Sequence, residues 1–317
     1  MRYTLRQLEY FIAAGEAGSI TLASERIHIS QPSISTAISH LEQELNVQLF
    51  VRHHAQGLSL TPVGRDLLRE AKNLVAQAQN LYLLASEVTD QVRGSLALGC
   101  MVTLAPMLVP ELTHSFTSSY PAASIRHTEG NHEELFEGLR RSEIDLAICY
   151  DLQIPEDIEF APLVELPPHV LMSADDPLAR KSSVELAEIA GKPMILLDLP
   201  ISGEYFLALF LNEGLEPTIA ARSAHHDVVR TMVANGYGYS ILNATPRSDS
   251  ALDGRKLVRV RLAGKHRPMT IGTATLKSLR KTKLVMAFSE HCQAHVSDAY
   301  IPGMIAPNCE APGQSGA

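Results

Sequence analysis

The chain has 317 residues, of which 45% are hydrophobic and 20% are charged, so it is long enough for two or three globular domains with real cores. It holds no run of about 18 uncharged apolar residues, and its first ten residues lack the apolar region of a signal peptide. We therefore expect a cytoplasmic protein with no membrane partner. The net charge of −8 argues against a protein that coats nucleic acid with its whole surface.

The distribution of charge and the cysteine spacing limit where DNA could bind and whether the chain holds a metal. Residues 1–93 carry 8 Lys and Arg against 9 Asp and Glu, so most of the negative charge lies in the remaining chain. Because an acidic surface is repelled by phosphates, any DNA contact should come from the first part. Cys100, Cys149, Cys292 and Cys309 show no metal-ligand spacing, so we expect buried thiols, no metal site and no cofactor.

Three short helices are predicted near the N-terminus. Apolar residues at helical spacing begin at Leu5, and Gly18-Ser19 then supplies a break and an N-cap. A second helix ends near Ile27, where residues 28–30 form a turn. A third helix opens at Gln31-Pro32, because proline is tolerated in a first turn.

The third helix has two different faces. One face is apolar, and its residues should point into a core: Ile34, Ile38, Leu41 and Leu45. The other face carries short polar groups, with Ser35 near its edge: Ser33, Thr36, Ser39 and His40. A helix-turn-helix of this kind can enter a major groove, although any three-helix bundle also has a polar outer face. Spacing alone leaves these two interpretations open.

A two-stranded wing is predicted next, since residues 51–60 alternate loosely around Gly57. With the wing included, the first 64 residues resemble the winged-helix signature of LysR-type transcriptional regulators. The residues that carry the resemblance are Leu8, Phe11, Gly18, Ser19, Ala23, Ser30, Gln31, Pro32, Ser35, Ile38, Leu41, Glu42, Leu49, Phe50, Arg52, Leu60, Thr61 and Gly64.

The resemblance implies a winged helix-turn-helix DNA-binding domain at residues 1–61 and double-stranded DNA as a partner. The residues expected to contact DNA are Ser30, Gln31, Ser33, Ser35, Thr36, Ser39, Arg52, His53 and His54. The chain departs from the family pattern at Thr36-Ala37, where a cation is usual, and at Asn46, where glycine is usual. His53 and His54 are expected either to contact phosphate when protonated or to be solvated bystanders. Fewer fixed cations should make DNA affinity depend more on oligomerisation.

A long helix is predicted at residues 62–93, because Thr61-Pro62 is a helix start and no breaker comes before Gly94. Such a helix would reach roughly 48 Å at about 1.5 Å per residue. Its apolar positions follow a heptad pattern: Leu67, Ala71, Leu74, Ala78, Leu81, Ala85 and Val88. The alternative is a helix lying on its own core, whereas the resemblance implies a linker helix that forms an antiparallel dimer. We expect self-association as a dimer or as a homotetramer.

From Ser95 onward, short apolar strands alternate with helices, as in an open α/β sheet. The pattern and the resemblance predict an α/β regulatory domain of two lobes, similar to periplasmic binding proteins, at residues 94–298. The first lobe should comprise about 94–164 and 267–298, and the second about 165–266. The tail at 299–317 is rich in Pro, Gly and Ala and is expected to be disordered.

No enzyme motif is present, and we expect no catalytic residues. The best candidate for catalysis is His225-His226-Asp227. Adjacent side chains on a helix point about 100° apart, so the two histidines make a poor metal pair. We interpret them as a helix start, where Asp227 is favourable.

An effector is expected between the lobes, at the turns that follow strands, where helix N-termini and hydroxyl groups bind small molecules. The expected effector-binding residues are Met101, Val102, Thr103, Asn131, Pro200, Ile201, Ser202, His225 and His226. None is Lys or Arg, so the effector should be weakly charged or singly anionic. If the protein is an activator, RNA polymerase is a further partner. The alternative function is a cytoplasmic solute-binding protein or an α/β enzyme with an accessory helical domain.

Overall fold

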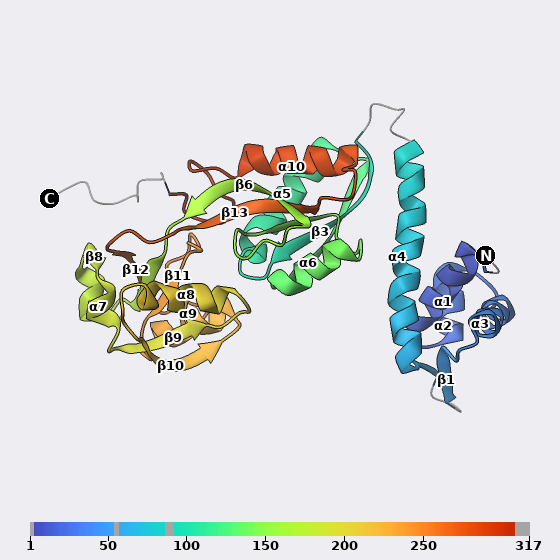
Figure 1. Cartoon of the computed structure of the whole chain (residues 1–317), viewed down its shortest axis with the longest axis horizontal. Coiled ribbons are helices and arrows are strands. Elements are labelled where there is room, and N and C mark those ends of the chain that lie inside the picture. The colour runs from blue at the N-terminus through green and yellow to red at the C-terminus, as the bar shows by residue number, and fades with distance from the viewer. Residues whose placement is uncertain (1–2, 54–56, 86–91, 308–317) are drawn as a thin grey trace. The chain divides into compact units, whose positions relative to one another are not determined.

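The computed structural model describes residues 3–53, 57–85 and 92–307 (Figure 1). The chain divides into two compact units. The first comprises Met1–Asp90, with residues 141–143 grouped with it, and the second comprises the rest of the chain. Within the described ranges, no helix is long and apolar enough to cross a membrane.

The first unit contains the three expected helices and the wing. The helices are α1 (Leu5–Ala17), α2 (Ile20–Ile27) and α3 (Gln31–Leu45), and the strands β1 (Phe50–His53) and β2 (Gly57–Leu60) pair antiparallel. The helix starts are capped by side chains of Thr4, Ser19 and Ser30. Since a cap satisfies backbone N–H groups that have no helical partner, the local sequence fixes where each helix begins.

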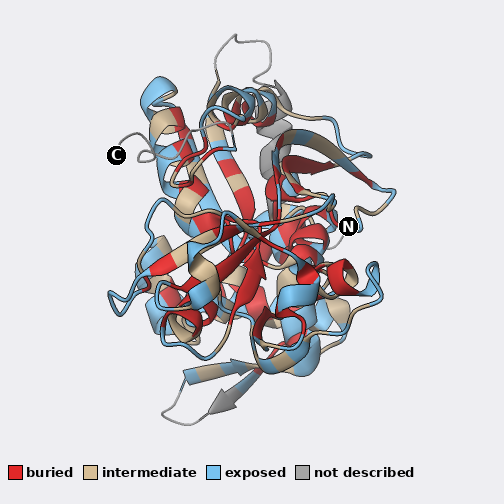
Figure 2. Cartoon of the chain, turned by 90° about the vertical axis from the view of Figure 1, so that its left-hand side faces the viewer, coloured by how far each residue is buried: buried red, intermediate tan, exposed pale blue. Residues whose placement is uncertain are grey.

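One small core holds this unit together. Leu8 and Phe11 of α1 and Ile34 and Leu41 of α3 are buried in it. The second unit has a core of its own, and Figure 2 shows buried residues along its strands. Glu42 accepts hydrogen bonds from the backbone N–H groups of Leu49 and Phe50, at 2.8 and 3.2 Å. This carboxylate ties the end of α3 to the first wing strand.

The predicted long helix is α4, described over Pro62–Ala85. Its first turns pack on the core of its own unit, where Ala71 is buried and Leu67 is partly buried. Leu74, further along the heptad seam, is 43% exposed. The side chains of Leu81, Ala85 and Val88 lie outside the described residues. The seam is therefore divided between contact with its own core and, at Leu74, exposure to solvent.

The second unit begins with a mixed five-stranded sheet in the order β4-β3-β5-β13-β6. The strands are β3 (Gly94–Met101), β4 (Ala123–Gly130), β5 (Leu146–Tyr150), β6 (Ile158–Leu166) and β13 (Met269–Leu276), and the helices are α5 (Ala105–Ser119), α6 (His132–Arg140) and α10 (Lys283–His295). Right-handed crossovers to either side of β3 place α5 and α6 on opposite faces (Figure 1).

The second lobe contains a four-stranded sheet, β11-β7-β12-β8, and a pair of parallel strands, β10-β9. Its strands are β7 (His169–Ser173), β8 (Ser183–Val184), β9 (Pro193–Leu197), β10 (Thr218–Ser223), β11 (Ser240–Leu242) and β12 (Leu257–Leu262), and its helices are η2 (Pro177–Arg180), α7 (Leu186–Ile189), α8 (Ser202–Leu211) and α9 (His226–Ala234). The chain crosses between lobes from β6 to β7 and from β12 to β13. The predicted two-lobed α/β fold is thus confirmed. The sequence pattern missed β6, β8 and α7.

Three of the cysteines are buried free thiols: Cys100, Cys149 and Cys292. Burial raises the pKa of each of these thiols, for Cys149 and Cys292 to about 12. Because the thiolate is the reactive form, such cysteines are inert packing residues. Cys309 lies outside the described residues.

The expected disordered tail is not what the structure shows for residues 299–307. Ile301 and Met304 are buried, and the segment hydrogen-bonds the loop after β11. Thr245 donates its hydroxyl to the carbonyl of Ile305 at 2.7 Å, and the backbone N–H of Arg247 donates to Gly303 at 3.1 Å. Composition misled the prediction, because a Pro- and Gly-rich segment can be ordered by contacts far away in sequence. Residues 308–317 lie outside the described ranges.

This C-terminal segment also contacts the first lobe, and Gly303 provides a test. Its φ is +65°, and a Cβ there would lie 2.9 Å from backbone and side-chain atoms of Met107 in α5. We expect Gly303→Ala to lower the free energy of unfolding by more than Gly254→Ala does. Gly254 has a φ of +84° and open space around it, so its change isolates the backbone cost of about 1–2 kcal/mol. Urea denaturation measures the free energy of unfolding of both variants. Equal losses of this free energy would show that the contact of Gly303 with α5 does not contribute to stability.

Candidate functional site

The outer surface of α3 is the first candidate site. Gln31, Ser33 and Thr36 are exposed on it. Ser30 is the N-cap, and its hydroxyl lies 2.8 Å from that of Ser33. A shallow hollow of about 430 Å³ follows this surface, lined by Gln7, Pro32, Ser33, Thr36, Ala37 and His40. Short side chains at the N-terminal end of an exposed helix allow close approach to a groove.

The other residues expected to contact DNA are half-buried or lie outside the described residues. Ser35 and Ser39 are half-buried at the edges of the surface. Arg52 and His53 belong to β1, but their side chains are outside the described atoms, as is the whole of His54. The structure therefore brings Gln31, Ser33 and Thr36 together and leaves the wing contacts as a prediction.

Sequence reasoning missed Gln7 as a neighbour of this surface. Its Oε1 accepts the backbone N–H of Thr4 at 2.8 Å, and its Nε2 lies 3.2 Å from Nδ1 of His40. The Thr-x-x-Gln spacing of a capping box was the available signal, but it marks a helix start and says nothing about the contact with α3.

The second candidate site is a narrow cleft between the lobes of the second unit. It is lined by Thr103, Tyr150, Leu197, Leu199, Ser202, Phe206, His226, Leu242, Asn243, Ala244 and Met269. The free volume inside is only about 10 Å³, less than a small metabolite needs.

Several buried polar atoms in this cleft have no hydrogen-bond partner within the described structure. They are Oγ of Ser202, Nε2 of His226 and Oδ1 of Asn243. A buried polar group without a partner costs free energy, so such atoms in one place indicate a surface built to bind something polar. The only hydrogen bond of the Thr103 side chain given by the described contacts is a long one of 3.4 Å to the hydroxyl of Tyr150, whose pKa is raised by burial.

The local sequence positions Ser202 through an unusual turn. The backbone N–H of Ser202 donates to the carbonyl of Pro200 at 2.7 Å, and Ile201 between them has φ +68° and ψ −49°. These angles are those of a strained γ-turn, which a β-branched residue seldom adopts. The turn starts α8 and directs Ser202 towards the cleft.

Three of the nine expected effector-binding residues meet in the cleft: Thr103, Ser202 and His226. Thr103 does not belong to the following helix, because α5 starts at Ala105, and the N-cap of α5, Leu104, makes no side-chain hydrogen bond. The hydroxyl of Thr103 lies 3.4 Å from the hydroxyl of Tyr150.

The remaining six do not line the cleft. Met101 is fully buried in the core and Val102 packs against it. The side chain of Asn131 accepts the backbone N–H of Glu134, which makes it a helix cap, and Pro200 and His225 are exposed. Ile201 faces another cavity. Tyr150 and Asn243 were missed. Asn243 directly follows β11 in the chain.

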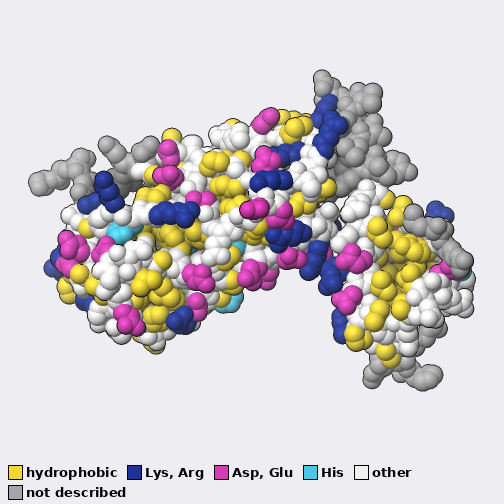
Figure 3. Space-filling view, in the orientation of Figure 1, with side chains coloured by type: hydrophobic (Ala, Val, Ile, Leu, Met, Phe, Trp, Pro, Cys, Tyr) yellow, Lys and Arg dark blue, Asp and Glu magenta, His cyan; other side chains and the backbone are white. Residues whose placement is uncertain are grey.

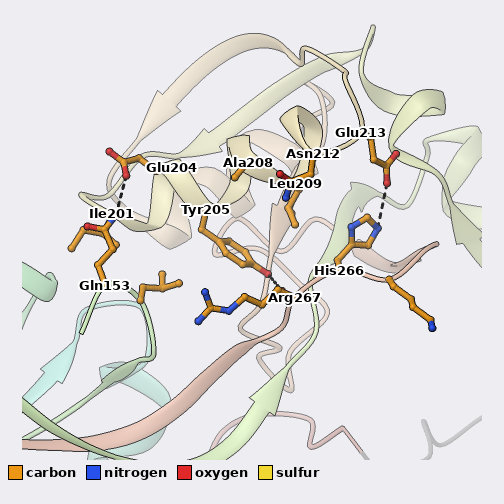
Figure 4. Close-up of a pocket in the computed structure, with 12 residues that line it drawn as sticks. Gln153, Ile201, Glu204, Tyr205, Ala208, Leu209, Asn212, Glu213, His266 and Arg267 are labelled. Carbon is orange, nitrogen blue, oxygen red and sulfur yellow. Dashed lines mark hydrogen bonds and ion pairs between the residues drawn. The ribbon is translucent and has the colours of Figure 1, made fainter. Parts of the chain in front are cut away.

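A larger cavity of about 490 Å³ lies beside the cleft, along another face of α8 (Figure 4). It is lined by Leu152, Gln153, Ile201, Glu204, Tyr205, Ala208, Leu209, Asn212, Glu213, Lys265, His266 and Arg267. Tyr205 donates its hydroxyl to the carbonyl of Arg267 at 2.6 Å. Asn243 donates to the same hydroxyl at 3.3 Å, so one hydrogen-bonded chain separates this cavity from the cleft.

A buried histidine next to the cleft predicts how stability depends on pH. Burial, followed by the charges of Arg259, His226 and Arg230, lowers the pKa of His169 to about 3. Between pH 3 and about 6.5, His169 is protonated in the unfolded chain but neutral in the folded chain. Its contribution to the free energy of unfolding is therefore fully present above pH 6.5 and is lost as the pH falls. We expect a loss of about 2 kcal/mol between pH 7 and pH 5, at about 1.4 kcal/mol per unit below 6.5.

His169→Gln should remove this contribution to the pH dependence in urea denaturation. Some dependence remains, because burial also lowers the pKa of His132 and of His291. His127→Gln is the matched control, because His127 is about half exposed beside Glu129. If both variants kept the wild-type slope, His169 would not be the residue responsible.

Comparison with known proteins identifies both parts of the chain. Residues 5–65 match the family model described as "Bacterial regulatory helix-turn-helix protein, lysR family". Residues 89–297 match the "LysR substrate binding domain". CysB of Haemophilus influenzae, an HTH-type transcriptional regulator, is 26% identical over 304 residues, which cover 94% of this chain and 92% of that protein.

Solved structures agree. A putative LysR family transcriptional regulator from Pseudomonas aeruginosa is 38% identical, with 93% of this chain and 99% of that chain covered and a TM-score of 0.64. CbnR, a LysR family regulator crystallised with its target DNA, shares the fold at 24% identity and a TM-score of 0.69, with 92% of this chain and 99% of that chain covered. These relatives are regulators, which excludes the alternative of a solute-binding protein or an enzyme. The chain belongs to the LysR family of bacterial transcriptional regulators, with a helix-turn-helix DNA-binding domain and an effector-binding domain.

Proposed function

We propose that the protein controls transcription in response to a small metabolite bound between its two regulatory lobes. The observation that carries this is the cluster of unpartnered polar atoms on Ser202, His226 and Asn243 in a cleft where Thr103 also lies. A ligand that hydrogen-bonds these atoms relieves the cost of burying them and so stabilises one arrangement of the lobes.

The chemistry of the cleft limits the metabolite. None of the residues lining it is Lys, Arg, Asp or Glu, and six are Leu, Phe, Met or Ala. A polyanion would find no counter-charge there, so we infer a weakly charged or singly anionic molecule with an apolar part. The hydroxyls of Thr103 and Ser202 would donate to its carbonyl or carboxylate oxygen.

DNA binding is assigned to the surface of α3 around Gln31, Ser33 and Thr36, with Ser30, Ser35, Ser39 and the wing residues Arg52, His53 and His54 at its margins. Self-association through α4 would place two such surfaces on one operator, as a dimer or within a homotetramer. The exposed Leu74 supports this contact. A cytoplasmic location and, for an activator, contact with RNA polymerase belong to the same proposal.

A footprint on the DNA upstream of the protein's own gene tests the regulator as a whole. We expect protection of a pseudo-palindromic site by the purified protein, with a pattern that changes when a metabolite mixture is added. Binding to this DNA no tighter than to a shuffled sequence would contradict the proposal. Specific DNA binding whose footprint does not change when metabolites are added would support the DNA-binding function but contradict control by an effector.

A further inference from the structure

The 490 Å³ cavity lies on a face of α8 other than the one that forms the cleft. Ile201, Tyr205, Ala208 and Asn212 line the cavity at spacings of four, three and four residues, so they form one helical face. Ser202 and Phe206, which line the cleft, lie on the neighbouring face. The cavity is large enough for a metabolite, since small-molecule sites usually measure about 300–1,000 Å³.

Its two walls carry charges of opposite sign. The α8 wall contributes Glu204 and Glu213, and the opposite wall, where the chain returns to the first lobe, contributes Lys265 and Arg267. Figure 4 shows both glutamates on the α8 side, with Tyr205 between them and Arg267. On the face of the unit that Figure 3 shows, acidic and basic side chains are mixed, whereas those that line the cavity come from opposite walls.

The charged groups retain free hydrogen-bonding capacity. Glu204 accepts one bond from Gln153 at 3.1 Å, and Glu213 lies 3.9 Å from His266. Arg267 uses only Nη2 to bind Asp151, at 3.0 Å, and its Nη1 and Nε make no hydrogen bond among the contacts of the described chain. Each wall can therefore bind a group of opposite charge without breaking an existing contact.

Backbone strain is concentrated around the same cavity. Gln153 has a φ of +46° and Ile201 a φ of +68°, and both side chains line it. A non-glycine residue with positive φ costs free energy, and such residues gather where a binding surface must be held in shape. Between them, Leu152 and Leu209 provide a buried apolar floor.

We propose that this cavity binds a second ligand, an amino-acid-like zwitterion. Its ammonium group lies towards Glu213, its carboxylate lies towards Lys265, and its side chain packs on Leu209 and the ring of Tyr205. A molecule with a single charge pairs with the groups of one wall only, so the site favours a ligand that carries both charges. The inference concerns the regulatory unit alone and does not depend on the effector of the cleft.

The test screens the twenty standard α-amino acids at millimolar concentration against the full-length protein by thermal denaturation, followed by calorimetry of those that bind. We expect at least one to raise the Tm by about 2 °C or more. Each is then compared with its deaminated acid and its decarboxylated amine; for L-leucine these are 4-methylpentanoate and 3-methylbutylamine. Both analogues should bind roughly 10-fold more weakly or worse, because each loses one charged contact.

Two neutral variants of similar shape locate the site. Glu213→Gln and Lys265→Gln should each weaken zwitterion binding roughly 10-fold. Glu216→Gln should not, because Glu216 is exposed close by in sequence but does not line the cavity. The proposal is overturned if no amino acid binds, if the acid or the amine binds as tightly as the zwitterion, or if both variants match Glu216→Gln. It is equally overturned if Ser202→Ala abolishes binding while Glu213→Gln does not, since the ligand then occupies the cleft.

Discussion

Gln31→Ala is expected to relax the base preference of the protein at one position of each operator half-site by about 1–3 kcal/mol, or roughly 5- to 150-fold. Gln31 is the first residue of α3 and is exposed at its N-terminal end. Its amide can donate to and accept from adenine at the same time, whereas alanine offers neither bond. A binding-site selection on random DNA measures the preference at every position.

Gln43→Ala is the matched control, because Gln43 is an exposed glutamine near the other end of α3. Neither alanine should unfold the helix, since alanine is the best helix former. If Gln31→Ala selected the same sites with the same affinity as Gln43→Ala, the assignment of Gln31 to base contact would be wrong.

Thr103→Val and Ser202→Ala are expected to abolish the response to the effector while operator affinity without effector stays within about two-fold. The two residues belong to different lobes and both line the cleft. If they hold the ligand only when the lobes close around it, each loss removes a differential contact, and a ligand shifts a conformational equilibrium only through such contacts. A reporter fused to the regulated promoter measures the response, with an inducer found by screening metabolites.

Thr113→Val is the control for this pair. Thr113 lies on α5, half-buried, and donates within its own helix to Val109 at 2.7 Å. The same change there should leave induction intact. Cleft variants that bind DNA and respond at wild-type inducer concentrations would show that the effector site lies elsewhere, and the cavity on the other face of α8 would then be the next place to test.

The N-terminal unit shows which structural features can be predicted from residues that are close in sequence. The start of α3 follows from Ser30 as a cap and proline in the first turn, and its apolar face follows from the spacing of Ile34 and Leu41. Such signals act between residues three or four apart, so they can be interpreted without knowing the fold. The proximity of Gln7 to His40, 33 residues away, could not be interpreted in this way.

The sequence by itself determined the helix-turn-helix, the wing and the two-lobed α/β architecture, because caps, turn residues and hydrophobic period are local properties of the chain. It also selected Thr103, Ser202 and His226, since each follows a strand at a turn. Only the tertiary structure decided that these three meet Tyr150 and Asn243, and that Asn131 serves as a helix cap.

The tertiary structure likewise determined that the C-terminal segment 299–307 is ordered and that charged residues line the larger cavity. Thr245 and Ile305 are bonded across 60 residues, and Glu213 and Lys265 come from opposite walls. Such pairs are fixed by the packing of whole elements rather than by propensity, because the entropy of closing a long loop is recovered only when all the contacts form together.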